Sequence, residues 1–187
     1  MKKYIYLIIS ILILNSCSAF LDIDPKASIS GENVIHDETS AQAAINGVYA
    51  ALRDYYSVNY QSIAYLSGDN VQWTGSQSLV QEFINHRVNS ENATLSSTWI
   101  DIYKTINRAN HIIKALETSA GESFSESVKN AVLGQAYGVR ALAYFDLVRV
   151  WGGVPLIIEP TENVGDNIGV KRSTADEVYE QVITDLN

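Results

Sequence analysis

The sequence RALAYFDLVRVWGGVP, from Arg140 to Pro155, carries more information about the fold than any other stretch of the chain. It predicts a helix with apolar and aromatic residues almost all the way round, and such a helix is expected to be central in the fold. Gly152 and Gly153 end this helix, and Pro155 prevents its continuation, because proline lacks the amide hydrogen that a helix needs. The stretch contains no catalytic motif.

The predicted central helix begins near Ser123 and continues to about Val150. Ser123 and Glu126 have the spacing of a capping box, in which two side chains satisfy free amides at a helix start. Small residues replace bulky ones on one side of the helix, and they predict a neighbouring helix that approaches closely. These small residues are Gly134, Gly138 and Ala141.

Three further segments repeat their apolar residues with the 3.6-residue period of an amphipathic helix. The first runs from Thr39, which forms a capping-box pattern with Gln42, to about Tyr56. The second, residues 94–116, has the clearest apolar stripe, made of Leu95, Trp99, Ile102, Ile106, Ala109, Ile113 and Leu116. The third, residues 174–187, has no stop signal.

The pattern of elements predicts an all-α fold. Consecutive helices without a series of strands favour antiparallel hairpins, as in solenoid repeats, so we expect tetratricopeptide-like helical hairpins with long loops. One such loop, from Ser57 to Asn92, separates the first two helices and is polar and aromatic. Loops of this length are usually functional or disordered, and the aromatic content argues against disorder.

The first residues have the layout of an exported lipoprotein. Lys2 and Lys3 precede an apolar run that ends at Leu14, and this run is too short to span a bilayer. Leu14 and Ser16 then lie at positions minus three and minus one from Cys17, which resembles a bacterial lipobox. We therefore predict a signal peptide (1–16), a lipidated tether (17–30) and a helical domain (31–187). The alternative is an ordinary signal peptide with a chance cysteine.

Charge and composition narrow the function further. The formal charge is −8, and loss of Lys2 and Lys3 with the signal makes the mature chain more acidic by two. Nucleic acid is therefore not an expected partner, since its binding depends on a basic face. Eleven tyrosines and three tryptophans accompany one methionine, and aromatic rings of this kind suit sugar recognition. The alternative is that these rings fill helix interfaces.

No catalytic, metal or cofactor site is predicted. The histidines His36, His86 and His111 are far apart and lack partners at metal-ligand spacing. Cys17, once acylated, leaves no thiol for a disulfide, a zinc site or a nucleophile. A pair of glycosidase carboxylates is not excluded by counting, but no carboxylate has a context that predicts catalysis. Asn92-Ala-Thr94 matches a glycosylation sequon, which we interpret as coincidence, with Thr94 as a helix cap.

Four motifs, in order along the chain, resemble the SusD/RagB family of outer-membrane nutrient-binding lipoproteins. They are the leader FLDIDP (20–25), the helical AAINGVYA (43–50), WIDIYKTINRAN (99–110) and RALAYFDL (140–147) continuing through WGGVP (151–155). Each motif alone is modest, and the four together in the same order make the resemblance specific.

The resemblance implies a non-enzymatic, lipid-anchored protein on the outer face of the outer membrane. It also implies a partner, a TonB-dependent transporter over which the lipoprotein acts as a lid, and ligands that are mostly oligosaccharides and sometimes peptides. Family members are longer, and this chain stops within a helix, so it resembles their amino-terminal portion. The alternative function is a tetratricopeptide-like scaffold lipoprotein that binds protein partners. An exported polysaccharide hydrolase has no support in the sequence.

The family's sugar site is shaped partly by loops that correspond here to Ser57–Asn92. The candidate ligand contacts in this segment are Asp69, Asn70, Trp73 and Arg87. An indole offers a stacking face and an N–H donor, while carboxylate, amide and guanidinium groups hydrogen-bond to hydroxyls. The alternative is that the Asp-Asn pair forms a turn, the tryptophan packs under the loop and the arginine is solvated. Trp151 is predicted to be structural, with its ring docked on the central helix that runs from Ser123 to about Val150.

Overall fold

The computed structural model describes residues 35–118 and 125–187. These ranges contain six helices and no strand, which confirms the all-α class. The helices are α2 (Glu38–Tyr55), α3 (Val58–Tyr65), α4 (Ser78–Ile84), α5 (Ala93–Thr118), α6 (Glu126–Trp151) and α7 (Ala175–Leu186). None of the six combines the length and the hydropathy that a membrane crossing requires. The predicted signal peptide, Cys17 and the tether lie outside the described residues.

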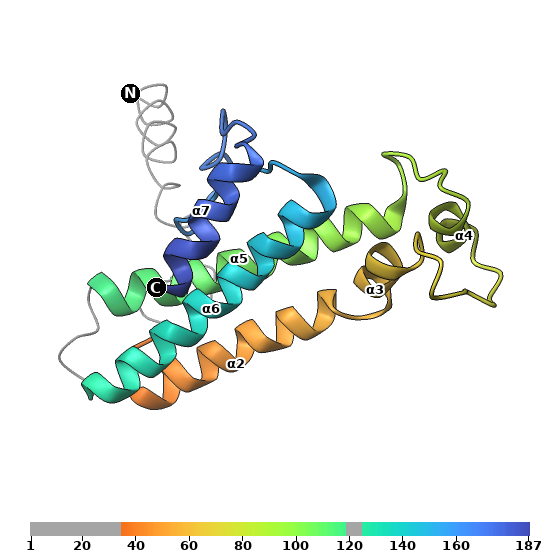
Figure 1. Cartoon of the computed structure of the whole chain (residues 1–187). Coiled ribbons are helices and arrows are strands. Elements are labelled where there is room, and N and C mark those ends of the chain that lie inside the picture. The colour runs from red at the N-terminus through yellow and green to blue at the C-terminus, as the bar shows by residue number, and fades with distance from the viewer. Residues whose placement is uncertain (1–34, 119–124) are drawn as a thin grey trace, which may run out of the picture. The chain divides into compact units, whose positions relative to one another are not determined.

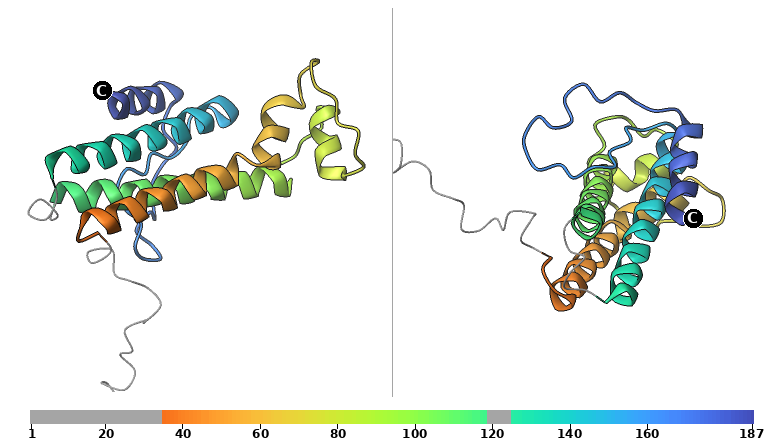
Figure 2. Two further views of the ribbon diagram at one scale, coloured as in Figure 1. Left: turned by 90° about the horizontal axis from the view of Figure 1, so that it is seen from below. Right: turned by 90° about the vertical axis from the view of Figure 1, so that its left-hand side faces the viewer.

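The helix α6 is central, as its apolar circumference predicts. It packs against α2, α5 and α7, and Figures 1 and 2 show α2, α5 and α6 running alongside one another with α7 beside α6. Residue 117 of α5 contacts residue 137 of α6, and residue 110 contacts residue 140, so α5 and α6 run antiparallel. Contacts at 140 with 185 and at 145 with 179 do the same for α6 and α7. The predicted antiparallel hairpins are therefore present.

Two apolar clusters form the core between these helices. The first joins α2, the second half of α5 and the first half of α6, around Ile45, Ile113 and Val139. The second joins the end of α2 to α3, α5, α6 and α7, around Ile106 and Leu147. The predicted apolar stripe of α5 is buried from residue 102 onward, whereas its first two members are only partly buried.

Two predicted helix caps are wrong by two residues. The capping box of α2 is formed by Asp37 and Ser40, not by Thr39 and Gln42, because the Asp37 carboxylate accepts the Ser40 amide at 2.7 Å. Asp37 is in the extended N-cap conformation, so the helix begins two residues earlier than a Thr39 cap would allow.

At the start of α5 the cap is Asn92 rather than Thr94. The Asn92 Oδ1 atom accepts the amides of Thr94 and Leu95, at 2.9 and 3.3 Å. Asn92 is also buried, with 1% exposure, because its side-chain amide donates to the Leu79 carbonyl and to Glu82 in the preceding segment. The matched sequon is therefore a buried helix cap.

The other two helix starts follow the predictions more closely. The helix α7 begins after a capping box of Thr174 and Glu177, where the sequence places its start. The helix α6 begins at Glu126 with Ser125 as N-cap, and the predicted cap Ser123 lies outside the described residues. Ser125 makes no side-chain cap; its amide and hydroxyl both donate to Glu38 of α2.

The Gly-Gly pair ends α6 as predicted, for two separate reasons. Gly152 has φ 71°, a conformation that side chains disfavour. A Cβ on Gly153 would lie 2.0 Å from the carbonyl oxygen of Ser173, so only glycine lets the returning chain approach. The prediction of a helix on the side of the small residues holds for Ala141, which is buried in the second cluster with Val178 and Val182 of α7. A Cβ on Gly134 or Gly138 would meet nothing within 4 Å, so packing does not require glycine at those two positions.

The predicted long loop of residues 57–92 is wrong in its centre, because it contains α3 and α4. The helix α4 has only seven residues, too few to display a helical period, and α3 has eight with little separation of polar and apolar faces. Packing explains why they form: Val80 and Phe83 of α4 are buried against Leu66, which follows α3. Burial of these side chains stabilises helices that are too short to be stable alone.

Candidate ligand-binding site

Residues 57–92, with α3 and α4, form a small unit beside the start of α5, here named the α3–α4 lobe (Figure 1). The lobe has its own apolar cluster, built on Leu66, Val80 and Phe83 and separate from the two clusters between the long helices. Trp73 lies at the edge of this cluster and is partly buried. The lobe therefore holds one of the four predicted ligand contacts in a packed position.

The Trp73 ring is fixed by two local contacts. Its indole Nε1 donates to the Gln77 side-chain oxygen at 3.1 Å. The ring also lies close to the backbone of Gly75, where a Cβ would come within 2.5 Å of the indole Nε1. A larger residue at position 75 would therefore displace the Trp73 or Gln77 side chain from this arrangement.

The three polar candidates are exposed around this indole's loop. Asp69 and Asn70 lie on the same loop between α3 and α4 as Trp73, whereas Arg87 follows α4 on the next connection. Within the described residues, none of these three side chains has a hydrogen bond or an ion pair. The structure therefore brings three candidates together on one loop, and no contact joins Arg87 to them.

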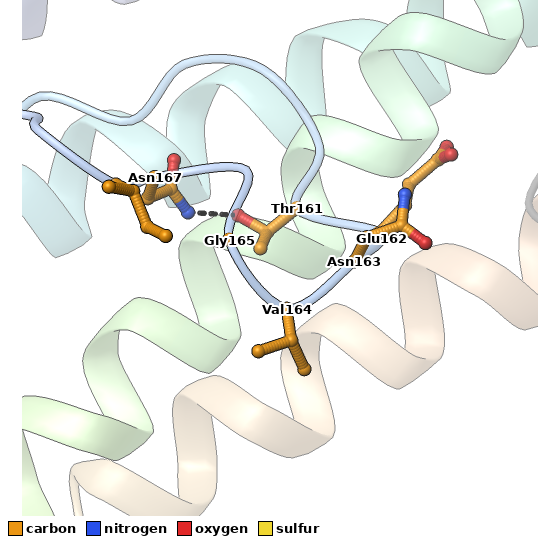
Figure 3. Close-up of a pocket in the computed structure, with 7 residues that line it drawn as sticks. Thr161, Glu162, Asn163, Val164, Gly165 and Asn167 are labelled. Atoms are coloured by element: carbon orange, nitrogen blue, oxygen red, sulfur yellow. Dashed lines mark hydrogen bonds between the residues drawn. The ribbon is translucent and has the colours of Figure 1, made fainter.

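A pocket lies where the chain returns after α6. Residues 161–168 curl into a loop that lines a shallow, open pocket of about 540 Å³, shown in Figure 3. The Asn167 amide donates to the Thr161 hydroxyl at 2.8 Å, and Asp166 accepts the amides of Glu162 and Asn163. These amide hydrogen bonds lower the pKa of the Asp166 carboxyl. Val164 at the tip is fully exposed.

A neighbouring pocket of about 340 Å³ lies against α5 and shares Thr161 and Asn167 with the first. Its aromatic wall is Trp99 and Tyr103, whose ring centroids are 5.0 Å apart. The polar groups here already have partners: the Tyr103 hydroxyl donates to the Pro155 carbonyl, and the Asn107 side chain bonds the Thr161 backbone twice. This wall therefore offers few free donors to a ligand.

Trp151 is part of the core, as its predicted structural role requires. Its ring is partly buried and meets Trp99 of α5 edge to face, with centroids 5.3 Å apart. The predicted docking of this ring on the central helix is wrong, because Trp151 is itself the last residue of that helix, α6, and its ring meets Trp99 of α5.

Sequence reasoning missed two buried polar networks, both centred on charged residues of α6. In the first, Arg140 forms a paired hydrogen bond with Asp185 of α7, at 2.8 and 2.7 Å. It also donates to the Asn110 side chain and to the Ile158 carbonyl. Burial acts to lower the pKa of Arg140, but the hydrogen bonds and charge of Asp185 outweigh it and the pKa is raised.

In the second network, Asp146 accepts the hydroxyls of three tyrosines. Tyr55 and Tyr56 donate to its Oδ2, at 3.1 and 2.7 Å, and Tyr60 donates to its Oδ1. Burial, followed by the adjacent carboxylate, raises the pKa of Tyr60 above its ordinary value, and both effects also act on the other two. A charged residue on the buried part of a largely apolar helix requires a buried partner, so the sequence indicated that Arg140 and Asp146 have partners without indicating which ones.

The histidines stay apart in the structure. His36 lies 3.8 Å from Asp37, His86 takes a φ of 51° just after α4, and His111 is partly buried on α5. Across the described ranges, no group of three or more histidine, cysteine or acidic side chains is placed to hold a metal ion.

Comparison with known proteins identifies the family. Residues 19–187 match the model of a SusD-like family described as "Starch-binding associating with outer membrane", and the chain belongs to this family. SusD-like protein P38 of Formosa agariphila is 33% identical over 96% of this chain and 35% of its own length. A SusD-like protein of Bacteroides ovatus is 27% identical over the whole chain and 34% of its own length.

Solved structures show the same fold. The protein described as B. fragilis NanU superposes with a TM-score of 0.72 at 32% identity, covering 87% of this chain and 32% of NanU. A structure described as "Laminarin binding SusD-like protein" gives 0.70 at 31% identity, covering 82% of this chain and 33% of its own. The chain therefore spans about a third of the length of the relatives that it matches.

Proposed function

We propose that the protein is a non-enzymatic, cell-surface lipoprotein that captures oligosaccharides and delivers them to a TonB-dependent outer-membrane transporter. The observation that carries this proposal is the α3–α4 lobe, where a fixed indole shares one exposed loop with polar side chains that have no partner among the described residues. The family description, with its starch binding and outer membrane, supports it, as does the laminarin-binding relative.

The chemistry of the loop suits a sugar. A pyranose ring presents an apolar face, which stacks on an indole, and a rim of hydroxyls, which both donate and accept hydrogen bonds. On this loop Asp69 accepts such bonds and Asn70 both donates and accepts them, and Arg87, on the connection after α4, is a further donor. Each of these groups exchanges water for a hydroxyl on binding, so the expected result is reversible capture without chemical change.

The anchor and the partner complete the proposal. Acyl chains on Cys17 hold the protein at the membrane, where each buried CH₂ contributes about 0.8 kcal/mol. The transporter partnership rests on the family, as does the possibility of peptide ligands. The chain matches about a third of its relatives' length, and other parts of such proteins can contribute to the ligand site.

The test is calorimetric titration of the full chain, and of its Trp73→Ala variant, with laminarin and starch oligosaccharides. Loss of the stacking face should cost about 1 to 3 kcal/mol, a 5- to 150-fold loss of affinity, because the indole N–H is already bonded to Gln77 and contributes only its ring. The matched control is Ile113→Val, in the core cluster that contains no lobe residue. It should lower stability by about 1 kcal/mol and leave affinity unchanged.

The outcomes separate the alternatives. If Trp73→Ala binds as tightly as the wild type but melts lower, Trp73 is a core residue and the lobe is not the site. If the wild type binds no oligosaccharide of the panel, the second candidate, a scaffold for protein partners, gains support. One observation already favours that candidate: a groove of about 430 Å³ between α6 and α7 exposes Phe145, Tyr179 and Ile183.

A further inference from the structure

We propose that Asp146 is a positioning residue that holds the α3–α4 lobe, and hence Trp73, in place through the hydroxyls of Tyr55, Tyr56 and Tyr60. The consequence for ligand binding rests on the function proposed above, whereas the mechanical role does not. The proposal is carried by the position of the three tyrosines in the chain, by the burial of the carboxylate and by the way the lobe is otherwise attached.

The three tyrosines span the junction at which the lobe begins. Tyr55 is the last residue of α2, Tyr56 is its C-cap, and Tyr60 lies in the first turn of α3. Only residues 56 and 57 separate the two helices, so the direction of α3 depends on this short turn. One carboxylate bonded on both sides of the turn restricts that direction.

The rings of these residues add to the restriction. Tyr55 and Tyr60 meet edge to face with centroids 5.8 Å apart, and Tyr56 lies against both, at 4.9 and 5.1 Å. The hydroxyls converge on a carboxylate that is 1% exposed and has no ion pair in the described part of the chain. Removal of a phenol hydroxyl therefore leaves a buried charge with fewer donors, which is costly.

The rest of the lobe is attached mainly to α5. The Asn59 amide donates to the Ser97 hydroxyl, and Asn92 ties α4 to the start of α5. Asp146 adds a tie from a different helix, the central α6. Two helices that hold a lobe from different sides fix its orientation, whereas a single attachment leaves it free to rotate.

Native-state hydrogen exchange of the full chain tests the mechanical role. Tyr60→Phe should make the amides of residues 58–65 exchange about 10-fold faster, because a hydrogen bond to a charged group is lost. The amides in the middle of α5 and α6 should be unchanged. The matched control is Tyr103→Phe, which removes one hydroxyl bond to the Pro155 carbonyl, outside the lobe. It should leave residues 58–65 as in the wild type.

Two results would overturn the proposal: unchanged exchange in residues 58–65, or equal acceleration in every helix, which would make Asp146 a general stabiliser. If circular dichroism shows that Tyr60→Phe is unfolded, Tyr56→Phe tests the same carboxylate at a less buried position. Laminarin titration is a separate measurement. If the wild type binds laminarin, Tyr60→Phe should weaken binding about 5-fold or more and Tyr103→Phe should not; if the wild type does not bind, the proposed function fails while the exchange result stands.

Discussion

The ion pair between Arg140 and Asp185 shows how much one residue of the central helix organises. The side chains of Arg140 and Asp185 are 6% and 1% exposed. The guanidinium also donates hydrogen bonds to the Asn110 side chain and to the Ile158 carbonyl. A buried charge pair gains little net stability over an apolar pair, but loss of one partner leaves the other uncompensated. The two residues should therefore be strongly coupled.

Arg140→Met or Asp185→Leu alone should lower the free energy of unfolding by about 3 to 5 kcal/mol. The double variant should be at least about 2 kcal/mol more stable than the sum of the two losses predicts, because no unpaired charge remains. Urea denaturation followed by circular dichroism measures the free energy of unfolding of the wild type, the two single variants and the double variant. The stability of Arg140→Lys should lie between those of the wild type and Arg140→Met, since an ammonium keeps the charge but cannot reproduce the paired geometry. Additive losses would show that the two side chains act independently.

At the scale of the element, α7 depends on its N-terminal capping box. The Thr174 hydroxyl accepts the Glu177 amide at 3.3 Å, and the Glu177 carboxylate accepts the Thr174 amide at 2.7 Å. Thr174→Ala should destabilise the protein by about 1 kcal/mol and increase hydrogen exchange most in the first turn of α7. Thr184→Ala, on the exposed side of the same helix, should change stability by less than about 0.5 kcal/mol. Equal effects of the two changes would mean that the box does not hold the helix start.

The same capping box predicts a pH dependence. Hydrogen bonds from Thr174 lower the pKa of Glu177 below its ordinary value of 4.5. The folded state therefore favours the ionised carboxylate, so its contribution is present above pH 4.5 and is lost as the pH falls through the lowered pKa. Local exchange in the first turn of α7 should rise on acidification, after correction for intrinsic rates. Glu177→Gln should show no such dependence.

The elements divide into those that the sequence predicts and those that it does not. All four helices with a long apolar period are present, because a stripe such as Ile102, Ile106 and Ala109 must face a core. The short α3 and α4 have no such signal, since packing around Phe83 stabilises them. The observed cap of α2 differs from the predicted one by two residues, because Asp37 and Thr39 are both suitable capping residues and the backbone conformation decides between them.

The candidate site was predictable only in part, for the same physical reason. The composition of residues 57–92 indicated a ligand loop, and the Trp73 indole is bonded there to Gln77. The side chains that bond to Arg140 and Asp146 lie 30 to 91 positions away along the chain. No local pattern identifies such pairs, although charges on an apolar helix show that partners must exist.

At the scale of the whole molecule, the net charge and the predicted lipid anchor both affect attachment to a membrane. The chain has a formal charge of −8, so a surface of anionic lipid repels it. Stable attachment to a membrane then depends on buried hydrocarbon, and two or more acyl chains on one cysteine supply enough of it. The lipobox-like sequence around Cys17, in the part of the chain outside the described residues, predicts where those chains are attached.

Cys17→Ala should therefore move the protein out of the membrane fraction when cells are broken and separated by centrifugation. The wild type should stay with the membrane through washes in high salt and be released by detergent, because hydrophobic burial is insensitive to the salt that screens charges. Ser18→Ala, one position further, preserves the cysteine and should fractionate as the wild type does. Mass spectrometry of the first mature peptide should show the acyl mass in the wild type and in Ser18→Ala only. A Cys17→Ala protein that remains in the membrane fraction would show that this cysteine is not the anchor.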